Sequence, residues 1–379
     1  MRTACQTTFR MKPNQRLLSL DTLRGFDMLF IMGFSGLVAS LCALWPNAFT
    51  DAVAGSMGHA AWDGLTHHDT IFPLFLFIAG VSFPFSLAKQ RANGLGQGAI
   101  LRKVIRRGAV LVVLGLVYNG LFKLDFASLR VASVLGRIGL AWMFAAILYI
   151  YCGVRTRGIV AAAVLIGYSL LLCLVAAPDA PAGAGPLSPE GNLVGWVDRQ
   201  WLPGRILYKT FDPEGLLSTV PAIVSAMFGM FTGEFLRRER PGLTGNRKAL
   251  YMALAAVAVT LVGIAWSGVM PINKKLWSSS FTCVVTGYSL GMFALFYYLI
   301  DVRGWKRWTL FFRVIGLNSI TIYLAQRIIG FGRISDFFLG GAASKCPEAV
   351  AAVVNGAGYV AVCWLFLYFL YKKNTFLKV

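Results

Sequence analysis

Ten long apolar stretches constrain this chain more than any other feature of its sequence. They lie near residues 26–45, 70–88, 108–122, 132–151, 158–177, 216–236, 249–270, 281–300, 310–330 and 349–371. A bilayer core of about 30 Å requires roughly 20 helical residues to cross it. The third stretch is long enough only if its helix begins near Ile100. The sequence therefore predicts an all-α, polytopic integral membrane protein with about ten transmembrane helices.

Composition and charge agree with this class. Hydrophobic residues make up 57% of the 379 residues and charged residues only 14%, too few to cover a soluble protein. The formal net charge of +20 would suggest nucleic acid in a soluble chain. Here 25 of the 36 Lys and Arg residues fall in every second loop. By the positive-inside rule both termini are cytoplasmic, and we expect membrane lipids and no nucleic acid as partners.

The domain organisation follows from the same pattern. Residues 1–15 are predicted to form a cytoplasmic N-terminal tail, and residues 16–379 a single transmembrane domain. The longest external segment, 178–215, is rich in Pro, Gly and Ser, and is expected to be a flexible loop. The first 25 residues are polar and basic, so no cleavable signal is expected.

All three histidines of the chain, His59, His67 and His68, fall in one external window together with Asp63 and Asp69. Histidine is the side chain best suited to move protons near neutral pH, and a neighbouring carboxylate would fix its tautomer. Two alternatives remain open. The histidines could make only local hydrogen bonds, or they could bind a metal, although the adjacent His67 and His68 tend to point apart and no further external histidine exists to complete a three-histidine set.

The apolar stretches also contain ionisable residues and prolines. Asp27, Arg137, Glu234, Arg313 and Arg327 lie within about a turn or two of a predicted helix end, as snorkelling side chains do. None lies at the bilayer centre, which disfavours a proton-driven transporter. The second and sixth stretches contain Pro73, Pro84 and Pro221, so these two helices are candidates for a cavity wall, with simple kinks as the alternative.

Six motifs in the chain resemble a known family. They are SLDTLRGFDMLFIM (19–32), GHAAWDGLTHHDTIFPLFLFIAGVS (58–82), RVASVLGRIGLAW (130–142), FDPEGLLSTVPAIVSAMFGMFTGE (211–234), PINKKLWSSSF (271–281) and GLNSITIYL (316–324). In this order they are similar to the catalytic domain of the heparan-α-glucosaminide N-acetyltransferase family, and the chain resembles a bacterial relative. The resemblance runs from about residue 16 to the C-terminus.

The resemblance implies a transmembrane acetyltransferase in the bacterial inner membrane. Acetyl would pass from cytosolic acetyl-CoA to an amino sugar or glycan on the external side, with His59 and Asp69 as catalytic residues and no metal. Residues on family motifs that imply acceptor binding are Trp62, Asp63, Asp212, Glu214, Asn273, Lys274 and Trp277. His67 and His68 are not generally kept in the family and are interpreted as incidental. Ser35 departs from the asparagine of the animal enzyme.

Coenzyme A requires cationic partners for its phosphates, and Arg provides bidentate contacts to them. Expected cofactor-binding residues are Arg24, Arg106, Arg107, Arg137, Arg237, Arg238, Asn318 and Ser319. An extended pantetheine arm is shorter than the bilayer of about 30 Å, so the thioester and His59 must meet in a re-entrant cavity.

Two functions remain after this reasoning. The first is the acetyltransferase, by direct transfer in a ternary complex or through a transient acetyl-histidine. The alternative is a secondary transporter or flippase for a glycan-type solute. The acceptor, the choice between N- and O-acetylation and the oligomeric state stay open, with a homodimer as an expectation.

Overall fold

The computed structural model describes residues 17–377, and this part of the chain is α-helical with no β-strand beyond two isolated bridges. The predicted tail of residues 1–15 lies outside the described residues. The α-helices are α1 (Leu18–Leu29), α2 (Ser35–Cys42), α3 (Ala48–Ser56), α4 (His67–Ala92), α5 (Gln97–Tyr118), α6 (Val134–Tyr151), α7 (Val154–Leu174), α8 (Leu193–Trp201), α9 (Thr219–Arg237), α10 (Gly245–Trp266), α11 (Ser279–Phe296), α12 (Thr309–Leu317), α13 (Ser319–Ile328), α14 (Phe331–Ala343) and α15 (Glu348–Lys372).

Eight helical segments within the described chain are long and apolar enough to cross a membrane, which confirms the all-α membrane class. The first of them, Leu18–Cys42, joins α1 and α2 through a π-helical segment, Phe30–Phe34. The other two predicted stretches are also helical, with different features. α5 is 22 residues long but carries a cluster of basic residues in its first half. The stretch near 310–330 is broken at Asn318 into α12 and α13.

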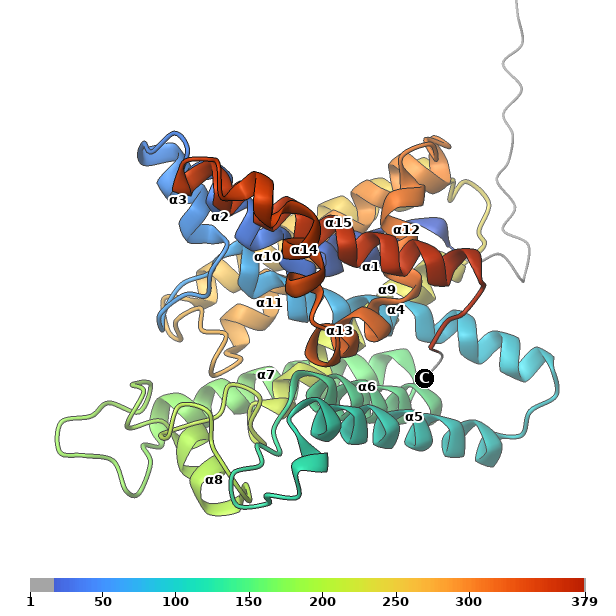
Figure 1. The fold of residues 1–379 in the computed structure, drawn as a ribbon. Coiled ribbons are helices and arrows are strands. Elements are labelled where there is room, and N and C mark those ends of the chain that lie inside the picture. Colours follow the sequence, from blue (N-terminus) through green and yellow to red (C-terminus); the bar gives the residue numbers. More distant parts are fainter. Residues whose placement is uncertain (1–16, 378–379) are drawn as a thin grey trace, which may run out of the picture.

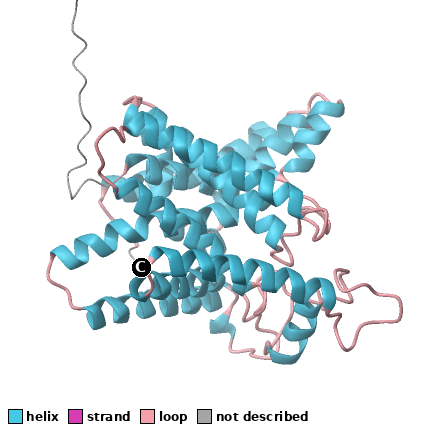
Figure 2. Cartoon of the chain, turned by 180° about the vertical axis from the view of Figure 1, so that it is seen from behind, coloured by secondary structure: helices cyan, strands magenta, loops and turns pink. Residues whose placement is uncertain are grey.

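Figure 1 shows two groups of helices in this fold. α5, α6, α7 and α8 form one group, and α1 with α10 to α15 forms the other. α4 and α9 lie between the groups and contact α6. The view from behind shows the same division, with loops gathered beyond the ends of the helices (Figure 2). The cavity described below is lined by helices of both groups, including α1 and α5, and by α4 between them.

Glycines bring the central helices into close contact. A Cβ atom at Gly80 of α4 would lie 2.2 Å from the carbonyl oxygen of Ala226 in α9, and one at Gly229 would lie 2.1 Å from that of Phe77. Such small-residue contacts let the backbones of membrane helices approach closely. The pairing of α4 with α9 is thus fixed by backbone packing, and a larger side chain at either glycine would separate the two helices.

The segment 178–215, which the charge pattern predicts to be external, is more structured than its composition predicts. It contains α8, and the buried Asp198 of that helix accepts hydrogen bonds from the backbone N–H groups of Asp212 (3.1 Å) and Leu216 (3.0 Å). Trp62 donates to the carbonyl oxygen of Leu187 at 2.9 Å, which joins this segment to the histidine-containing loop. A description as a flexible loop is therefore wrong for much of the segment, because buried polar groups anchor it.

Candidate active site

Asp69 is held rigidly in the first turn of α4. Its Oδ2 atom accepts hydrogen bonds from the backbone N–H groups of Ala60 (3.1 Å) and Thr66 (3.3 Å) and from the Thr66 hydroxyl (2.8 Å). The dipole at a helix N-terminus also favours a carboxylate at this position. The Asp69 side chain is only 1% exposed. With Oδ2 occupied by these three donors, Oδ1 is left to face His59.

His59 and Asp69 form a close pair. The Nδ1 atom of His59 lies 2.7 Å from Oδ1 of Asp69. A carboxylate in this position accepts the Nδ1 proton, so the neutral ring keeps its Nε2 atom unprotonated. The His59 side chain is 50% exposed, so a substrate can reach the ring. This geometry suits a general base whose imidazolium form the buried carboxylate stabilises.

Lys274 completes this group from the loop before α11. Its Nζ atom lies 3.2 Å from Oδ1 of Asp69 and 3.1 Å from Nδ1 of His59. Because His59 gives its Nδ1 proton to Asp69, the partner of the ammonium is the carboxylate. Burial lowers the pKa of Lys274 below the ordinary lysine value, while the carboxylates of Asp69 and Glu214 oppose that shift.

Asn273 and Trp277 shape the turn that presents Lys274. Both are buried, and Asn273 accepts a hydrogen bond from the N–H of Leu276 at 2.9 Å. Trp277 has a positive φ of 51°, which is costly for a bulky residue and requires support from its surroundings. Its ring nitrogen donates to Ser225 at 3.3 Å. The structure therefore places these two residues beneath the site as supports, whereas the sequence predicted them to contact the acceptor.

Trp62 and Asp63 lie in the loop between His59 and α4. The Trp62 ring packs edge-on against Phe211, with a centroid distance of 5.1 Å. The ammonium of Lys275 lies 5.9 Å from the Trp62 ring and bonds to the carbonyl oxygen of Ala61. Asp63 is exposed beside them. Lys275 is a neighbour that the sequence reasoning did not single out.

Asp212 and Glu214 are both paired with Arg130. The guanidinium of Arg130 donates to the two oxygens of Asp212 at 2.8 and 2.6 Å, and it also contacts Glu214. Burial alone lowers the pKa of Arg130, but these carboxylates raise it above its ordinary value. Arg130 was missed by the sequence reasoning, although it begins the motif at 130–142 and is a basic residue on the acidic face.

Arg137 contacts the segment that follows Asp212 and Glu214, and it lies apart from the other predicted coenzyme residues. It is 2% exposed, and its guanidinium donates to Ser218 and, at 3.3 Å, to the carbonyl oxygen of Gly215. The same group lies 5.1 Å from the centre of the Trp277 ring. These contacts connect α6 to the start of α9 and to the turn that carries Lys274.

The two adjacent histidines face different partners. The ring of His68 lies 4.6 Å from that of His59, and its Nδ1 atom is 3.2 Å from the Ser35 hydroxyl. The ring of His67 lies 4.4 Å from Phe30. His68 is therefore part of the site, although the family resemblance had set it aside. Within residues 17–377 no three His, Cys, Asp or Glu side chains are grouped as metal ligands.

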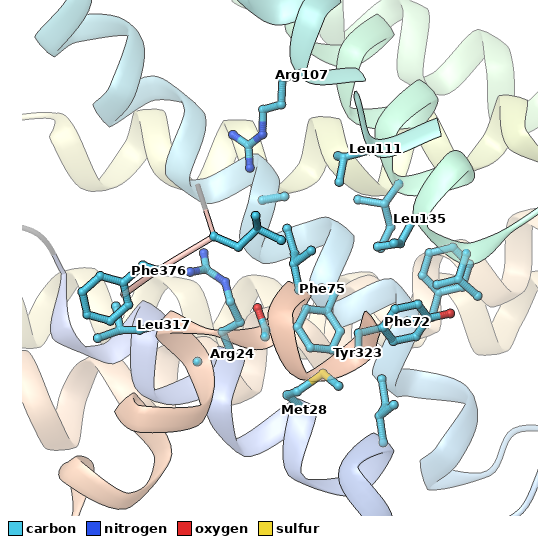
Figure 3. Close-up of a pocket in the computed structure, with 18 residues that line it drawn as sticks. Arg24, Met28, Phe72, Phe75, Arg107, Leu111, Leu135, Leu317, Tyr323 and Phe376 are labelled. Carbon is cyan, nitrogen blue, oxygen red and sulfur yellow. The ribbon is translucent and has the colours of Figure 1, made fainter. Parts of the chain in front are cut away.

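A cavity of about 350 Å³ lies along α1 and α4, and its lining in α4 begins at Phe72, three residues after Asp69 (Figure 3). It is lined by Arg24, Met28 and Ile31 of α1, Phe72, Phe75 and Ala79 of α4, Arg107 and Leu111 of α5, Val134, Leu135 and Ile138 of α6, Gly316 and Leu317 of α12, Ser319, Ile320 and Tyr323 of α13, and Phe376 and Leu377. Figure 3 shows Arg24 and Arg107 directed into the same part of the cavity from opposite walls. The lining is otherwise mostly apolar.

α4 forms part of the cavity wall, as its prolines suggested, but α9 does not contribute to it. The glycine contacts described above pack α9 against α4. Of these two helices, only α4 therefore lines the cavity.

A second, more polar hollow adjoins the cavity at Arg107. Its volume is about 430 Å³, and its lining includes Lys103, Arg106 and Arg107 of α5 with Gln90 of α4. The guanidinium of Arg107, which lines both spaces, lies 4.4 Å from the centre of the Trp142 ring. Arg107 therefore lies where the apolar cavity meets the polar hollow, and Lys103 and Arg106 also line that hollow.

Three predicted coenzyme residues lie away from both spaces. Arg237 donates to the carbonyl oxygen of Pro84 at 3.0 Å, and Arg238 pairs with Glu234 at 3.6 Å. Asn318 is buried at the junction of α12 and α13, where its oxygen accepts a hydrogen bond from Thr321. Of the predicted set, Arg24, Arg107 and Ser319 share the cavity and Arg106 lies beside it.

The fold and the site together define a polytopic α-helical membrane protein with a carboxylate-supported histidine beyond one end of an apolar cavity and arginines at the other. No family model matches the sequence. The chain is 26% identical over 372 residues to heparan-alpha-glucosaminide N-acetyltransferase of Mus musculus and 25% identical over 418 residues to that of Homo sapiens. These alignments cover 85% and 96% of the chain but only 56% and 60% of the relatives. The chain is thus similar to these proteins over most of its own length and over little more than half of theirs.

Proposed function

We propose that this protein transfers an acetyl group from acetyl-CoA to an amine or hydroxyl of an amino sugar or glycan on the other side of the membrane. One observation carries the proposal. His59 and Asp69 form a buried-carboxylate pair beyond one end of the cavity, and Arg24 and Arg107 lie at its opposite end. The relatives are named for N-acetyl transfer to a glucosaminide, which supports the same chemistry.

The length of the cavity suits the donor. In the continuous helix α4, His68 precedes the cavity-lining residue Ala79 by eleven residues, roughly 16 Å at 1.5 Å per helical residue. An extended pantetheine arm is about 15–20 Å long, judged from the reach of an extended chain. With its phosphates near Arg24, Arg106 and Arg107, acetyl-CoA would place its thioester close to His68 and His59. Charge-assisted contacts from arginine are the ones suited to these phosphates.

The proposed reaction needs one base at His59. The acceptor nitrogen or oxygen attacks the thioester carbonyl carbon while Nε2 of His59 removes its proton. The C–S bond then breaks, and the coenzyme thiolate takes that proton from the imidazolium. Asp69 stabilises the imidazolium, as carboxylates do in acyl-transfer triads. A burst of free coenzyme A before acceptor is added would instead identify an acetyl-histidine intermediate.

The charge pattern of the loops supports the direction of transfer. Basic residues in alternate segments assign the arginine end of the cavity to the cytoplasm and His59 to the opposite side. An impermeant thiol reagent should label cysteines introduced at Gly55 and Ala180 only from outside. Cysteines introduced at Gly94 and Gly242 should react only from the cytoplasmic side. Reversed labelling would remove the reason for transfer across a membrane.

The decisive test is acetyl transfer in proteoliposomes. Labelled acetyl-CoA on the cytoplasmic side and a panel of amino sugars on the other should give acetylated sugar with wild-type protein, and none with His59→Ala. The variant should still bind acetyl-CoA, because Arg24 and Arg107 are remote from the ring. Movement of unmodified sugar without acetylation would refute the proposal and favour a transporter.

A further inference from the structure

The first span is interrupted next to the active site. Residues Phe30–Phe34 form a π-helical segment, and Gly33 within it has a φ of 109°. A Cβ atom at Gly33 would lie 2.8 Å from the Tyr359 ring, so both the backbone angle and the space require glycine. Single π-helical turns inside α-helices are frequent at functional sites. This one ends where Ser35 begins α2.

Both histidines in the first turn of α4 contact the interrupted segment of the first span or the residue just after it. Phe30, at its start, packs against His67, and Ser35, just after its end, bonds to Nδ1 of His68 at 3.2 Å. The His68 ring in turn meets His59 edge-on at 4.6 Å. His68 is therefore held in place from one side by a hydroxyl and from the other by the proposed base.

His68 also lies directly beyond the end of the cavity. Phe72 lines the cavity, and His68 precedes it by four positions in α4. Residues four apart on an α-helix lie on the same face, one turn away along the axis. His68 therefore lies one turn of α4 beyond Phe72 on the face that lines the cavity, and Ser35 and His59 contact it there.

The two imidazoles have different partners and so suit different tasks. His59 is supported by the Asp69 carboxylate, which stabilises a positive ring. His68 has a neutral hydroxyl partner, and the charged or titratable groups near it are His59, Lys274, Asp69 and His67. A proton gained by His59 makes a second proton on His68 unfavourable, because like charges repel at this distance. Paired groups in contrasting environments commonly divide acid, base and donor roles in this way.

We propose that His68 is a second catalytic histidine, which binds the carbonyl oxygen of the acyl donor and stabilises the negative charge that develops on it. The inference rests on the acetyl-transfer function proposed above. In this role the Ser35 hydroxyl, 3.2 Å from Nδ1 of His68, would be the donor, and the neutral ring would carry its proton on Nε2 and donate it to the carbonyl oxygen. This reverses the interpretation of His68 as incidental.

The negative charge on the carbonyl oxygen forms and disappears within the transfer reaction that His59 serves as base. As the acceptor forms its bond to the carbonyl carbon, the C=O π electrons move to the oxygen, and the N–H of His68 stabilises that charge without transferring its proton. When the carbonyl re-forms, the C–S bond breaks and the thiolate takes the proton held by His59. The products are the acetylated acceptor and free coenzyme A, and His68 ends in its starting form.

The test compares His68→Ala, His68→Gln and Ser35→Ala with His67→Ala as the matched control. Loss of one oxyanion donor typically lowers kcat about 10²- to 10³-fold, and we expect that loss for His68→Ala with unchanged acetyl-CoA affinity. Gln can donate from its amide but cannot act as an acid or base at neutral pH. His68→Gln should therefore recover at least tenfold over Ala and keep the wild-type pH profile. The kcat of Ser35→Ala should lie between those of these two variants. Without the hydroxyl the proton of His68 can move to Nδ1, but the ring is still present.

The possible outcomes separate the two proposals. Wild-type protein that transfers no acetyl refutes both the function and the role of His68. Wild-type transfer with full activity in His68→Ala refutes only the role of His68. Equal losses in His67→Ala and His68→Ala would also overturn the role of His68, because the histidine pair would then act only in packing. No recovery of activity in His68→Gln would overturn it too, because His68 would then act as a base.

Discussion

Asp69→Asn is the substitution for which the structure makes the sharpest prediction. The three donors on the Oδ2 side, two backbone N–H groups and the Thr66 hydroxyl, require an oxygen there. The amide oxygen of the variant must take that position, so the NH₂ group replaces Oδ1 and faces His59. It would donate to Nδ1 and force the ring proton onto Nε2, which leaves no base for the acceptor.

The size of the effect follows from this change of tautomer. In an acyl-transfer triad the same substitution lowers kcat about 10⁴-fold. We expect a loss of roughly 10³- to 10⁴-fold here, equal to about 4–5.5 kcal/mol in the barrier at 1.36 kcal/mol per tenfold. The Lys274 ammonium, 3.2 Å from Oδ1, would also face an amide NH₂. The thermal midpoint should fall as well, because a charge-assisted hydrogen bond is worth about 1.5–3 kcal/mol.

The assay is single-turnover acetyl transfer in detergent, with acetyl-CoA affinity measured on the same samples. Asp51→Asn is the matched control, because Asp51 is exposed in the first turn of α3 and is not one of the predicted site residues. Unchanged acetyl-CoA affinity in both variants would show that they remain folded. Asp69→Asn with more than a tenth of wild-type kcat, or an equal loss in Asp51→Asn, would refute the tautomer argument.

Three further predictions concern binding, stability and pH. Arg107→Gln should weaken acetyl-CoA binding roughly 10- to 150-fold, while Arg237→Gln, away from the cavity, should bind it like the parent protein. Equal acetyl-CoA affinities in all three proteins would mean that acetyl-CoA binds elsewhere. Lys274→Met should lower the free energy of unfolding by about 1–3 kcal/mol because the buried Asp69 loses its cation; an unchanged thermal midpoint would contradict this. Burial raises the pKa of Asp198 to about 6, so the folded state binds this proton more tightly than the unfolded state. The protein should therefore lose up to about 3 kcal/mol of stability as pH rises from about 4 through 6. Asp198→Asn should remove that contribution from the pH dependence of thermal unfolding, and an unchanged slope would refute it.

The helices could be predicted from the sequence because each requires only its own apolar residues. α5 shows the limit of that reasoning. Its basic cluster shortened the apolar stretch, yet the helix extends from Gln97 to Tyr118 because Arg107 is accommodated beside Trp142 and the cavity. The break at Asn318 between α12 and α13 was likewise not predicted, since the surrounding residues remain apolar.

The pairing of His59 with Asp69 is a local property of the sequence. Ten residues separate them, and the turn that ends at Thr66 brings the loop back onto the start of α4. The histidine window and its carboxylates are therefore recognisable as a candidate site from the amino-acid sequence alone. The division of roles among its three histidines is not.

What only the tertiary structure decided is which distant residues join that pair. Lys274 is 215 positions from His59, Arg130 is 82 from Asp212, and Ser35 is 33 from His68. Contacts at such separations depend on how whole helices pack, through glycines such as Gly80 and Gly229 and through the interrupted first span. The sequence by itself determined the membrane helices and the His–Asp pair, because both depend on neighbouring residues. The cavity and the partners of that pair depend on helix packing, which no local pattern encodes.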